Sequence, residues 1–415
     1  LVVRPLSAVR RFVALDQDPL AAGHVLAVEA VLDGSIQVSE DRLRVSARLL
    51  RVSDGRQLWA EQFDEKRTDV FGVQDAITEK VAAALSVRLS GRPHPDTTHI
   101  EAYEQYMLGR LYSLKLVRSE VDKGILHFER AIEIDPNYAL GYVGIAEAQF
   151  PLVMSNDVDP LAVFPQARRA ALRAVELNPN LADAQLALGM IAFWYDWDWP
   201  EAERRFVRAL DLNPNNSRAR SMYAHLLSNT GRHDRALAEA RQARELEPAS
   251  VFGRSVEGLL LQQAGLTEAA VEHLRRTVDL EPMFWLSHHF LSASLIENRR
   301  YEEAVYEADV ARKLSPLQTH SVAFRGVALA AHGRTVEARA VLDELLQASR
   351  ERYVPPTNIG MLYAALGEQD SALEQLEKAF AEKDVRMVFI KVEPRWNSLR
   401  SDARFVELMK RMNFY

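Results

Sequence analysis

Small and apolar residues recur along most of the chain with a step of 34 positions. One row of alanines keeps this step without interruption: Ala202, Ala236, Ala270, Ala304, Ala338 and Ala372. A second row of small residues and a row of prolines keep it at two other phases: Ala224, Gly258, Ser292, Gly326, Gly360, and Pro214, Pro248, Pro282, Pro316. Small residues let two helices approach closely, and proline ends a helix. The pattern therefore predicts stacked helix pairs.

The repeated pattern extends beyond the regular rows in both directions. Pro179 and Pro136 continue it backwards at spacings of 35 and 43, which predicts inserted loops, the larger one between Pro151 and Pro160. We expect about eight helix pairs over residues 96–385. The tail, 386–415, is expected to cap the last pair with a helix that Ser401 starts. Its apolar side is Phe405, Leu408, Met409 and Met412.

Residues 1–95 lack the 34-residue step and predict a small α/β domain. Leu43, Val45, Ala47 and Leu49 alternate with polar residues, which is the pattern of a half-buried strand. The full order predicted is β-α-β-β-β-α, in a mixed sheet. It comprises a strand at Leu1 to Leu6, a helix that Asp18-Pro19 starts, strands near 30–36, 42–49 and 58–63 with a turn at 53–56, and a helix that Asp69 caps.

The repeated unit resembles the tetratricopeptide repeat (TPR). The motif residues that match in two units are Tyr223, Ala224, Leu227, Ala236, Ala243 and Pro248, and Leu291, Ser292, Leu295, Ala304, Ala311 and Pro316. The tryptophan usual near the start of a unit is replaced by Arg220, Arg254 or His288. The resemblance implies a mainly α protein, a right-handed superhelix whose first helices line the inside.

The front end and two later segments resemble a family of bacterial multidomain signalling proteins. The similar segments are Asp18 to Gly23, Val31 to Ile36, Leu58 to Glu61, Val70 to Asp75, Trp197 to Trp199 and Arg395 to Phe405. Such proteins join a winged-helix, kinase or cyclase effector to an α/β module, similar to the amino-terminal domain of the Tol-Pal β-propeller protein, and to a TPR array. The resemblance implies that the effector and part of the α/β module lie upstream of Leu1.

Composition and motifs favour binding over catalysis. The chain has 415 residues, a net charge of −7 and no cysteine, which disfavours a nucleic-acid surface and removes thiolate chemistry. It lacks a phosphate loop, a His-Glu-x-x-His motif and a run of 18 apolar residues. The pair His288-His289 points in two directions on a helix. We therefore expect no enzyme, cofactor, metal or membrane span.

Two clusters have a structural and a functional interpretation. Arg42, Arg44, Arg48 and Arg51 are interpreted as a solvated sheet face rather than an anion site, because the first 98 residues carry 13 basic and 14 acidic side chains. The aromatic run Phe193, Trp194, Tyr195, Trp197 and Trp199 is interpreted as packing of a one-residue insertion against the neighbouring unit, rather than as a ligand cage.

The inner face of the superhelix is the candidate binding site for a protein or peptide. Its predicted groove residues are Tyr106, Arg110, Phe193, His225, Asn229, Gln262, Gln263 and His289. Small-ligand sensing by the α/β domain and self-assembly of the array stay open as alternatives. The chain would lie outside the inner membrane if a membrane helix precedes Leu1, and in the cytoplasm otherwise. The partner, the signal and the oligomeric state stay open.

Overall fold

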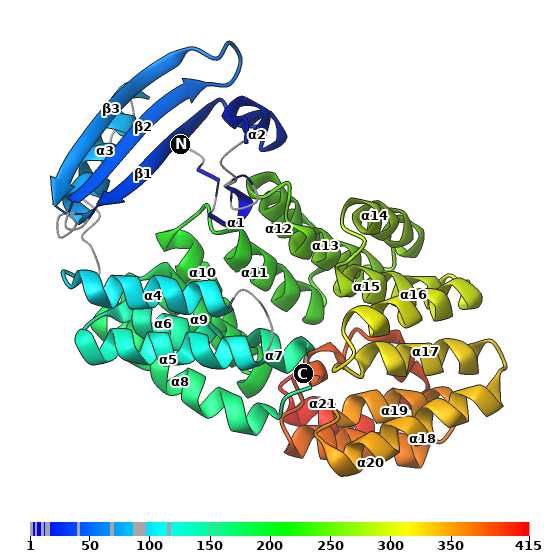
Figure 1. Cartoon of the computed structure of the whole chain (residues 1–415). Coiled ribbons are helices and arrows are strands. Elements are labelled where there is room, and N and C mark those ends of the chain that lie inside the picture. The colour runs from blue at the N-terminus through cyan, green and yellow to red at the C-terminus, as the bar shows by residue number, and fades with distance from the viewer. Residues whose placement is uncertain are drawn as a thin grey trace.

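The computed structural model describes residues 3–4, 6–9, 12, 17–39, 42–66, 70–85, 97–113, 118–148, 150–155 and 157–414. Figure 1 shows two parts, a three-stranded sheet with its helices near the N-terminus and a long curved array of helices. The chain is mainly helical, as expected, and within the described ranges no helix has the length and hydropathy needed to cross a membrane.

The sheet module is an antiparallel meander. Its strands β1 (Ala30–Ser39), β2 (Arg42–Arg51) and β3 (Gln57–Lys66) pair in sequence order. Helix α3 (Val70–Ala84) packs Val73 on Leu43 and Val45, which are the inward residues of the alternating strand. Short helices α1 (Leu6–Val9) and α2 (Pro19–Val25) precede the strands.

Two of the predictions for this module are wrong, and a third is not tested. Asp18 caps α2 by accepting a hydrogen bond from the backbone N–H of Leu20, and the strands and their turn lie as predicted. The strand expected at Leu1 to Leu6 is wrong where the structure describes it, because Leu6 begins a helix. The described sheet is therefore antiparallel rather than mixed. The predicted cap Asp69 lies outside the described residues.

The arginines of β2 form ion pairs across the exposed sheet face. Arg42 and Arg44 both contact Asp64 at 2.6 Å, and Arg48 contacts Asp33 at 2.7 Å. Hydrogen bonds from Arg44 and Arg42 lower the pKa of Asp64. Paired charges on a solvated face agree with the structural interpretation of this cluster.

The array consists, in the described residues, of eight antiparallel helix pairs, as predicted. The pairs are α4 (Ile100–Ser113) with α5 (Arg118–Ile134), α6 (Ala139–Ala148) with α8 (Pro160–Leu177), α9 (Ala182–Ile191) with α10 (Trp199–Leu212), α11 (Ser217–Asn229) with α12 (His233–Leu246), α13 (Val251–Gln263) with α14 (Thr267–Leu280), α15 (Trp285–Glu297) with α16 (Tyr301–Leu314), α17 (His320–Ala331) with α18 (Thr335–Glu351), and α19 (Pro356–Ala365) with α20 (Gln369–Ala381).

Small residues sit where two helices cross, which explains the 34-residue step. All six alanines of the first row are fully buried. A methyl group added to Gly258 would lie 2.4 Å from Leu274 Cγ, and one added to Gly189 would lie 2.7 Å from Phe206. Larger side chains at these positions would force the paired helices apart.

The two stretched spacings are accommodated in different ways. The larger insertion forms the short helix α7 (Phe150–Ser155) between α6 and α8. The one-residue insertion before Pro200 becomes a π-helical turn, η3 (Ala192–Asp196), which ends at Trp197 in the left-handed conformation with φ 62°. A π-turn absorbs one additional residue without breaking the helix.

The C-terminal segment, residues 385–414, contains η4 (Val385–Phe389), η5 (Pro394–Leu399) and α21 (Ala403–Arg411). Asp402, rather than the predicted Ser401, caps α21, because its carboxylate accepts the backbone N–H of Arg404. Helix α21 contacts α20, where a cap was expected, and the segment then continues into the middle of the array (Figure 1).

Candidate functional site

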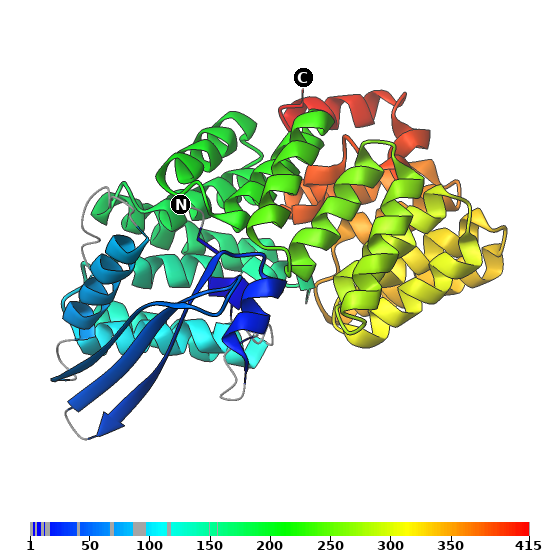
Figure 2. The ribbon, with the colours of Figure 1, turned by 90° about the horizontal axis from the view of Figure 1, so that it is seen from above.

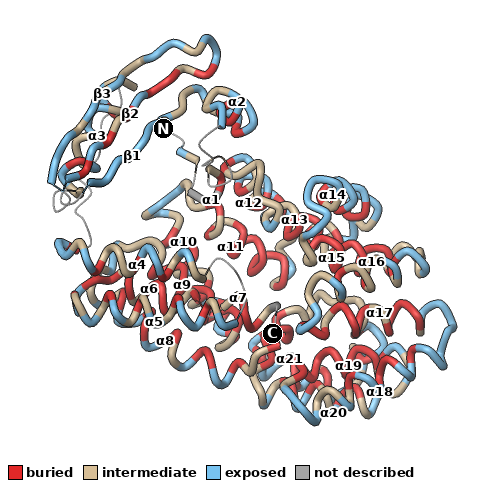
Figure 3. The backbone as a smooth tube through the Cα atoms, viewed as in Figure 1, coloured by how far each residue is buried: buried red, intermediate tan, exposed pale blue. Residues whose placement is uncertain are grey.

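The inner face of the array is formed by the first helix of each pair. Helices α11, α13, α15, α17 and α19 contact one another in succession. These helices are buried nearly all round; in α9 every residue from Ala184 to Ile191 is buried. Figure 3 shows this burial as continuous red stretches in the inner helices. A helix in an open groove exposes one side to solvent, so another element must cover the inner side.

The C-terminal segment is that cover. It contributes a row of side chains that are buried in the same hydrophobic core as the repeats: Val385, Met387, Val388, Ile390, Trp396, Leu399, Phe405, Leu408, Met409, Met412 and Phe414. Figure 2 shows the same segment, in orange and red, lying against the repeats rather than apart from them. From η3 onward, the groove is thus filled by the chain itself.

The tryptophans of the aromatic run hold one end of this segment. Trp199 donates its Nε1–H to the carbonyl of Met412 at 2.8 Å and stacks on Phe414 at 4.6 Å between ring centroids. Trp194 contacts Phe389 at 5.8 Å. Their burial confirms the packing interpretation. Trp194 also contacts Phe150 and His225 of the neighbouring units, as expected, whereas the C-terminal partners lie about 200 residues away.

Two cations hold the middle of the segment. Arg395 donates to the carbonyl of Ala293 at 3.0 Å and lies 4.5 Å above the ring of Phe324. Lys391 donates to the carbonyl of Thr230 at 3.4 Å. Because Thr230, Ala293 and Phe324 belong to three different repeat units, the segment contacts several units of the array at once.

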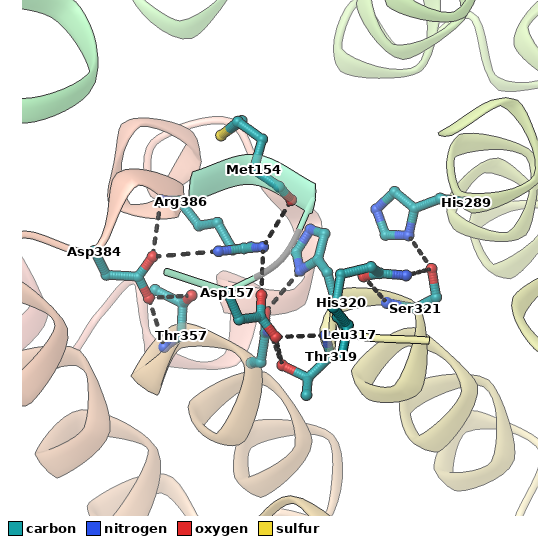
Figure 4. Close-up of polar contacts among 12 residues, drawn as sticks. Met154, Asp157, His289, Leu317, Thr319, His320, Ser321, Thr357, Asp384 and Arg386 are labelled. Carbon is teal, nitrogen blue, oxygen red and sulfur yellow. Dashed lines mark hydrogen bonds and ion pairs between the residues drawn. The ribbon is translucent and has the colours of Figure 1, made fainter. Parts of the chain in front are cut away.

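A buried polar network, which we call the Asp157 network, joins the insertion to the far end of the array. It consists of Asp157, Thr319, Thr357, Asp384 and Arg386 (Figure 4). Asp157 accepts the backbone N–H and the hydroxyl of Thr319, both at 2.6 Å, and pairs with Arg386 at 3.1 Å. Asp384 accepts the hydroxyl of Thr357 at 2.6 Å.

The charges of this network are almost completely removed from solvent. The side chain of Asp157 is fully buried and that of Arg386 is 5% exposed. Burial raises the pKa of Asp157, whereas the nearby Arg386 guanidinium and the Thr319 donors oppose that shift. A buried ion pair contributes less to net stability than to fixing one arrangement, because both charges lose their hydration. The network therefore specifies how residues 150–157 meet the last units.

The first three predicted groove residues lie in the first half of the array. Tyr106 is buried between the rings of Phe128 and Tyr138, and Arg110 lies 5.8 Å above the Tyr106 ring and is half-buried. Phe193 is fully buried between Trp194 and Trp199. Tyr106 and Arg110 share α4, and Phe193 lies apart from them in η3.

The next four lie on α11 and α13. His225 is buried 6.2 Å from the ring of Phe389, so it contacts the C-terminal segment. Gln263 donates to Asn229 at 3.1 Å and accepts the hydroxyl of Ser228 at 2.6 Å. Among the described residues, Asn229 Nδ2, Gln262 Oε1 and His225 Nδ1 are buried without a hydrogen-bond partner.

His289 lies in a buried cluster with His320. Their ring centroids are 4.5 Å apart, and His289 Nδ1 is 3.2 Å from the Ser321 hydroxyl (Figure 4). Desolvation lowers the pKa of His289 to about 3 and that of His225 to about 4, so both rings are neutral near pH 7. The peptide-contact role of all eight residues stays a prediction, and burial leaves Arg110 and Gln263 as the partly exposed ones.

The residues that close the groove were not among the predicted site residues. Asp157 lies in a loop and Arg386 in the short 3-10 helix η4, both outside the repeated helix pairs, so no periodic pattern singles them out. The sequences of the inner helices do indicate that the groove is covered, because α9, α15 and α19 carry apolar residues on every side. That composition is typical of a fully buried helix and indicates a covered inner face. Within the described residues, no group of three His, Asp or Glu side chains could hold a metal.

Comparison with protein-family models agrees with the repeated helix pairs of the array. Three models described as "Tetratricopeptide repeat" match residues 198–251, 256–319 and 357–383. The array contains tetratricopeptide repeats. Arrays of this kind are protein–protein interaction scaffolds, so the TPR array is the part of the chain to which a binding role belongs.

Relatives and solved structures are more distant. The chain is 30% identical over 128 residues to "Putative adenylate cyclase 3" of Rhizobium meliloti (strain 1021), which covers 29% of this chain and 22% of that protein. The chain therefore matches about a fifth of that relative's length. Among solved structures, yeast Tom70 covers 75% of this chain and 67% of its own at 17% identity, with a TM-score of 0.47. YrrB, titled as a TPR protein with an unusual peptide-binding site, covers 47% and 95% at 19% identity, with a TM-score of 0.32.

Proposed function

We propose that the chain is the partner-binding part of a bacterial signalling or regulatory protein, and that it acts as a non-catalytic scaffold. The observation that carries this proposal is the TPR array itself, eight helix pairs around one continuous core. The partial match to a longer protein named as a cyclase supports the signalling context. A protein or peptide partner would dock on a surface that the C-terminal segment leaves free.

The free part of the inner groove that best suits a partner is on α4. In the described chain, the hydrogen bonds, ion pairs and ring contacts of the C-terminal segment reach α7, Asp157 and elements from η3 onward. On α4, Met107, Leu108 and Leu111 are exposed, and Arg110 lies between them. Exposed apolar side chains around one cation suit a partner that offers apolar side chains beside a carboxylate.

The experiment starts from the purified 415-residue chain as bait. A partner recovered from bacterial extract is identified, and its affinity is measured by calorimetry for the wild type, Leu111→Glu and the control Leu126→Glu. Leu126 is similarly exposed but lies on α5. We expect Leu111→Glu to weaken binding about tenfold or more and Leu126→Glu to leave it unchanged.

The outcomes separate the site from the function. A partner that binds both variants equally well places docking elsewhere and leaves the scaffold role intact. A chain that recovers no saturable partner contradicts the scaffold role itself.

A further inference from the structure

The two edges of the sheet module differ in how they are protected. Strand β3 carries Glu61, Asp64, Glu65 and Lys66, and such charges prevent an edge from pairing with another strand. Strand β1 has one charged residue, Asp33, and neither lysine, arginine nor proline. In the described residues β1 pairs only with β2, so its outer edge is a ten-residue strand without the usual protection.

The unprotected edge also carries exposed apolar side chains. Leu32, Ile36 and Val38 are 49%, 68% and 60% exposed. The register places them opposite Leu49, Val45 and Leu43, on the same sheet face that α3 covers over β2 and β3. The face is thus apolar on β1 and β2, whereas β3 adds Glu61 and Glu65 to it, and the outermost apolar strand, β1, is open to solvent.

The sequence of β1 matches itself when two copies run antiparallel about a two-fold axis at Ser35. In this register Leu32 faces Val38 of the partner copy, and Ile36 faces Gly34, which leaves room for the larger side chain. Asp33 faces Gln37, so no two like charges oppose each other. A register whose axis lies two residues further along, at Gln37, places Val38 opposite Ile36 but leaves Leu32 without a partner in the strand.

We propose that β1 is a self-association edge that pairs with β1 of a second copy of this chain and forms one continuous six-stranded sheet. Such an isologous contact uses the same strand twice and closes at two copies. Figure 2 shows the ends of the strands projecting beyond the helices of the array. Because ten paired residues form an interface smaller than about 800 Å² per partner, the dimer is weak and concentration-dependent.

The absence of cysteine from the chain allows a direct test of the register. In the antiparallel dimer the two Ser35 Cα atoms lie about 4.5–5.5 Å apart, within disulfide range. We expect Ser35→Cys to form a covalent dimer under mild oxidation. The matched control is Ser39→Cys on the same strand, whose two copies would lie about 27 Å apart and should stay monomeric.

Sedimentation velocity from about 1 to about 100 micromolar measures the association itself. We expect the wild-type chain to show a monomer–dimer equilibrium and Ile36→Lys to raise the dissociation constant at least about tenfold. The control Val336→Lys changes an 85%-exposed valine on α18 and should associate like the wild type. A wild type that is monomeric throughout, or a Ser39→Cys variant that cross-links as fast as Ser35→Cys, overturns the proposal.

Discussion

In the TPR array, residues about 200 positions apart share one core, whereas the sheet module is held together by strands that are neighbours in sequence. The core of the array extends from Ala102 to Phe414, and the core of the module consists of Leu43, Val45 and Val73 with partly buried neighbours. A repeat array ordinarily depends on contacts between adjacent units. Here the C-terminal segment adds contacts between distant units, so the array should unfold as one body and the module separately.

The largest effect should come from removing the C-terminal segment, with a chain that ends at Asp384. The segment buries more than ten apolar side chains, each worth about 1.5–3 kcal/mol, and their sum exceeds the stability of a typical domain. We expect the truncated array to lose its cooperative thermal transition, measured by circular dichroism, and to bind a hydrophobic dye. A truncated chain with an unchanged transition would show that the array does not depend on this closure.

The second largest effect should come from the Asp157 network. Asp157→Asn keeps an oxygen for Thr319 and tolerates the φ of 50°, but it removes the nearer of the two buried carboxylates that pair with Arg386 and leaves only Asp384, at 3.9 Å. We expect a loss of about 3–5 kcal/mol in the free energy of unfolding, measured with urea. The double variant with Arg386→Met should lose less than the sum of the single variants, and strict additivity would show that the two side chains are not coupled.

Acid should destabilise the array through its buried histidines. Desolvation lowers the folded-state pKa of His225 to about 4, below its ordinary value of 6.5, so the unfolded chain binds the proton more readily. The stability contributed by the neutral ring is complete above pH 6.5 and is lost as the pH falls from 6.5 towards 4, by about 3 kcal/mol. The urea midpoint measured across this range should depend less on pH in His225→Phe, and parallel pH profiles would contradict the assignment.

The smallest effect should be confined to the sheet module. Val73→Ala removes two methyl groups from its small core and should cost about 2 kcal/mol. Hydrogen exchange followed by mass spectrometry should show faster exchange in β1 to β3 and unchanged exchange in α9 to α20. Faster exchange in both regions would show that module and array unfold together, and the comparison between them would then fail.

Sequence periodicity predicts the local architecture well because the causes of that architecture are local. The alanines of the 34-residue step lie at helix crossings, and Pro214 or Pro248 follows the end of a helix. The closure of the groove by the C-terminal segment has no such local cause. Nothing near Met412 indicates that its carbonyl receives the indole N–H of Trp199, because that contact depends on the curvature summed over the units between them.

Prediction from sequence periodicity has the same limit at the candidate site. The phase of the repeat places His225 on an inner helix, and the structure agrees, but the phase alone does not reveal that Phe389 covers it. The wrong prediction of a strand at Leu1 to Leu6 has a comparable cause. It depended on a short apolar run without support from a turn or a partner strand. Apolar composition on all sides of α9, α15 and α19 was the sequence feature that indicated the cover.

The π-turn η3 and its tryptophans also set an order of events during synthesis. About 190 residues separate η3 from Val385, and a ribosome adds about 5–20 residues per second, so η3 leaves the ribosome about 10–40 s before its cover. During that interval Trp194 and Trp199 face an unfilled groove. The nascent chain therefore exposes an aggregation-prone aromatic surface during this interval. A chaperone that binds apolar segments would protect the chain from aggregation at that stage.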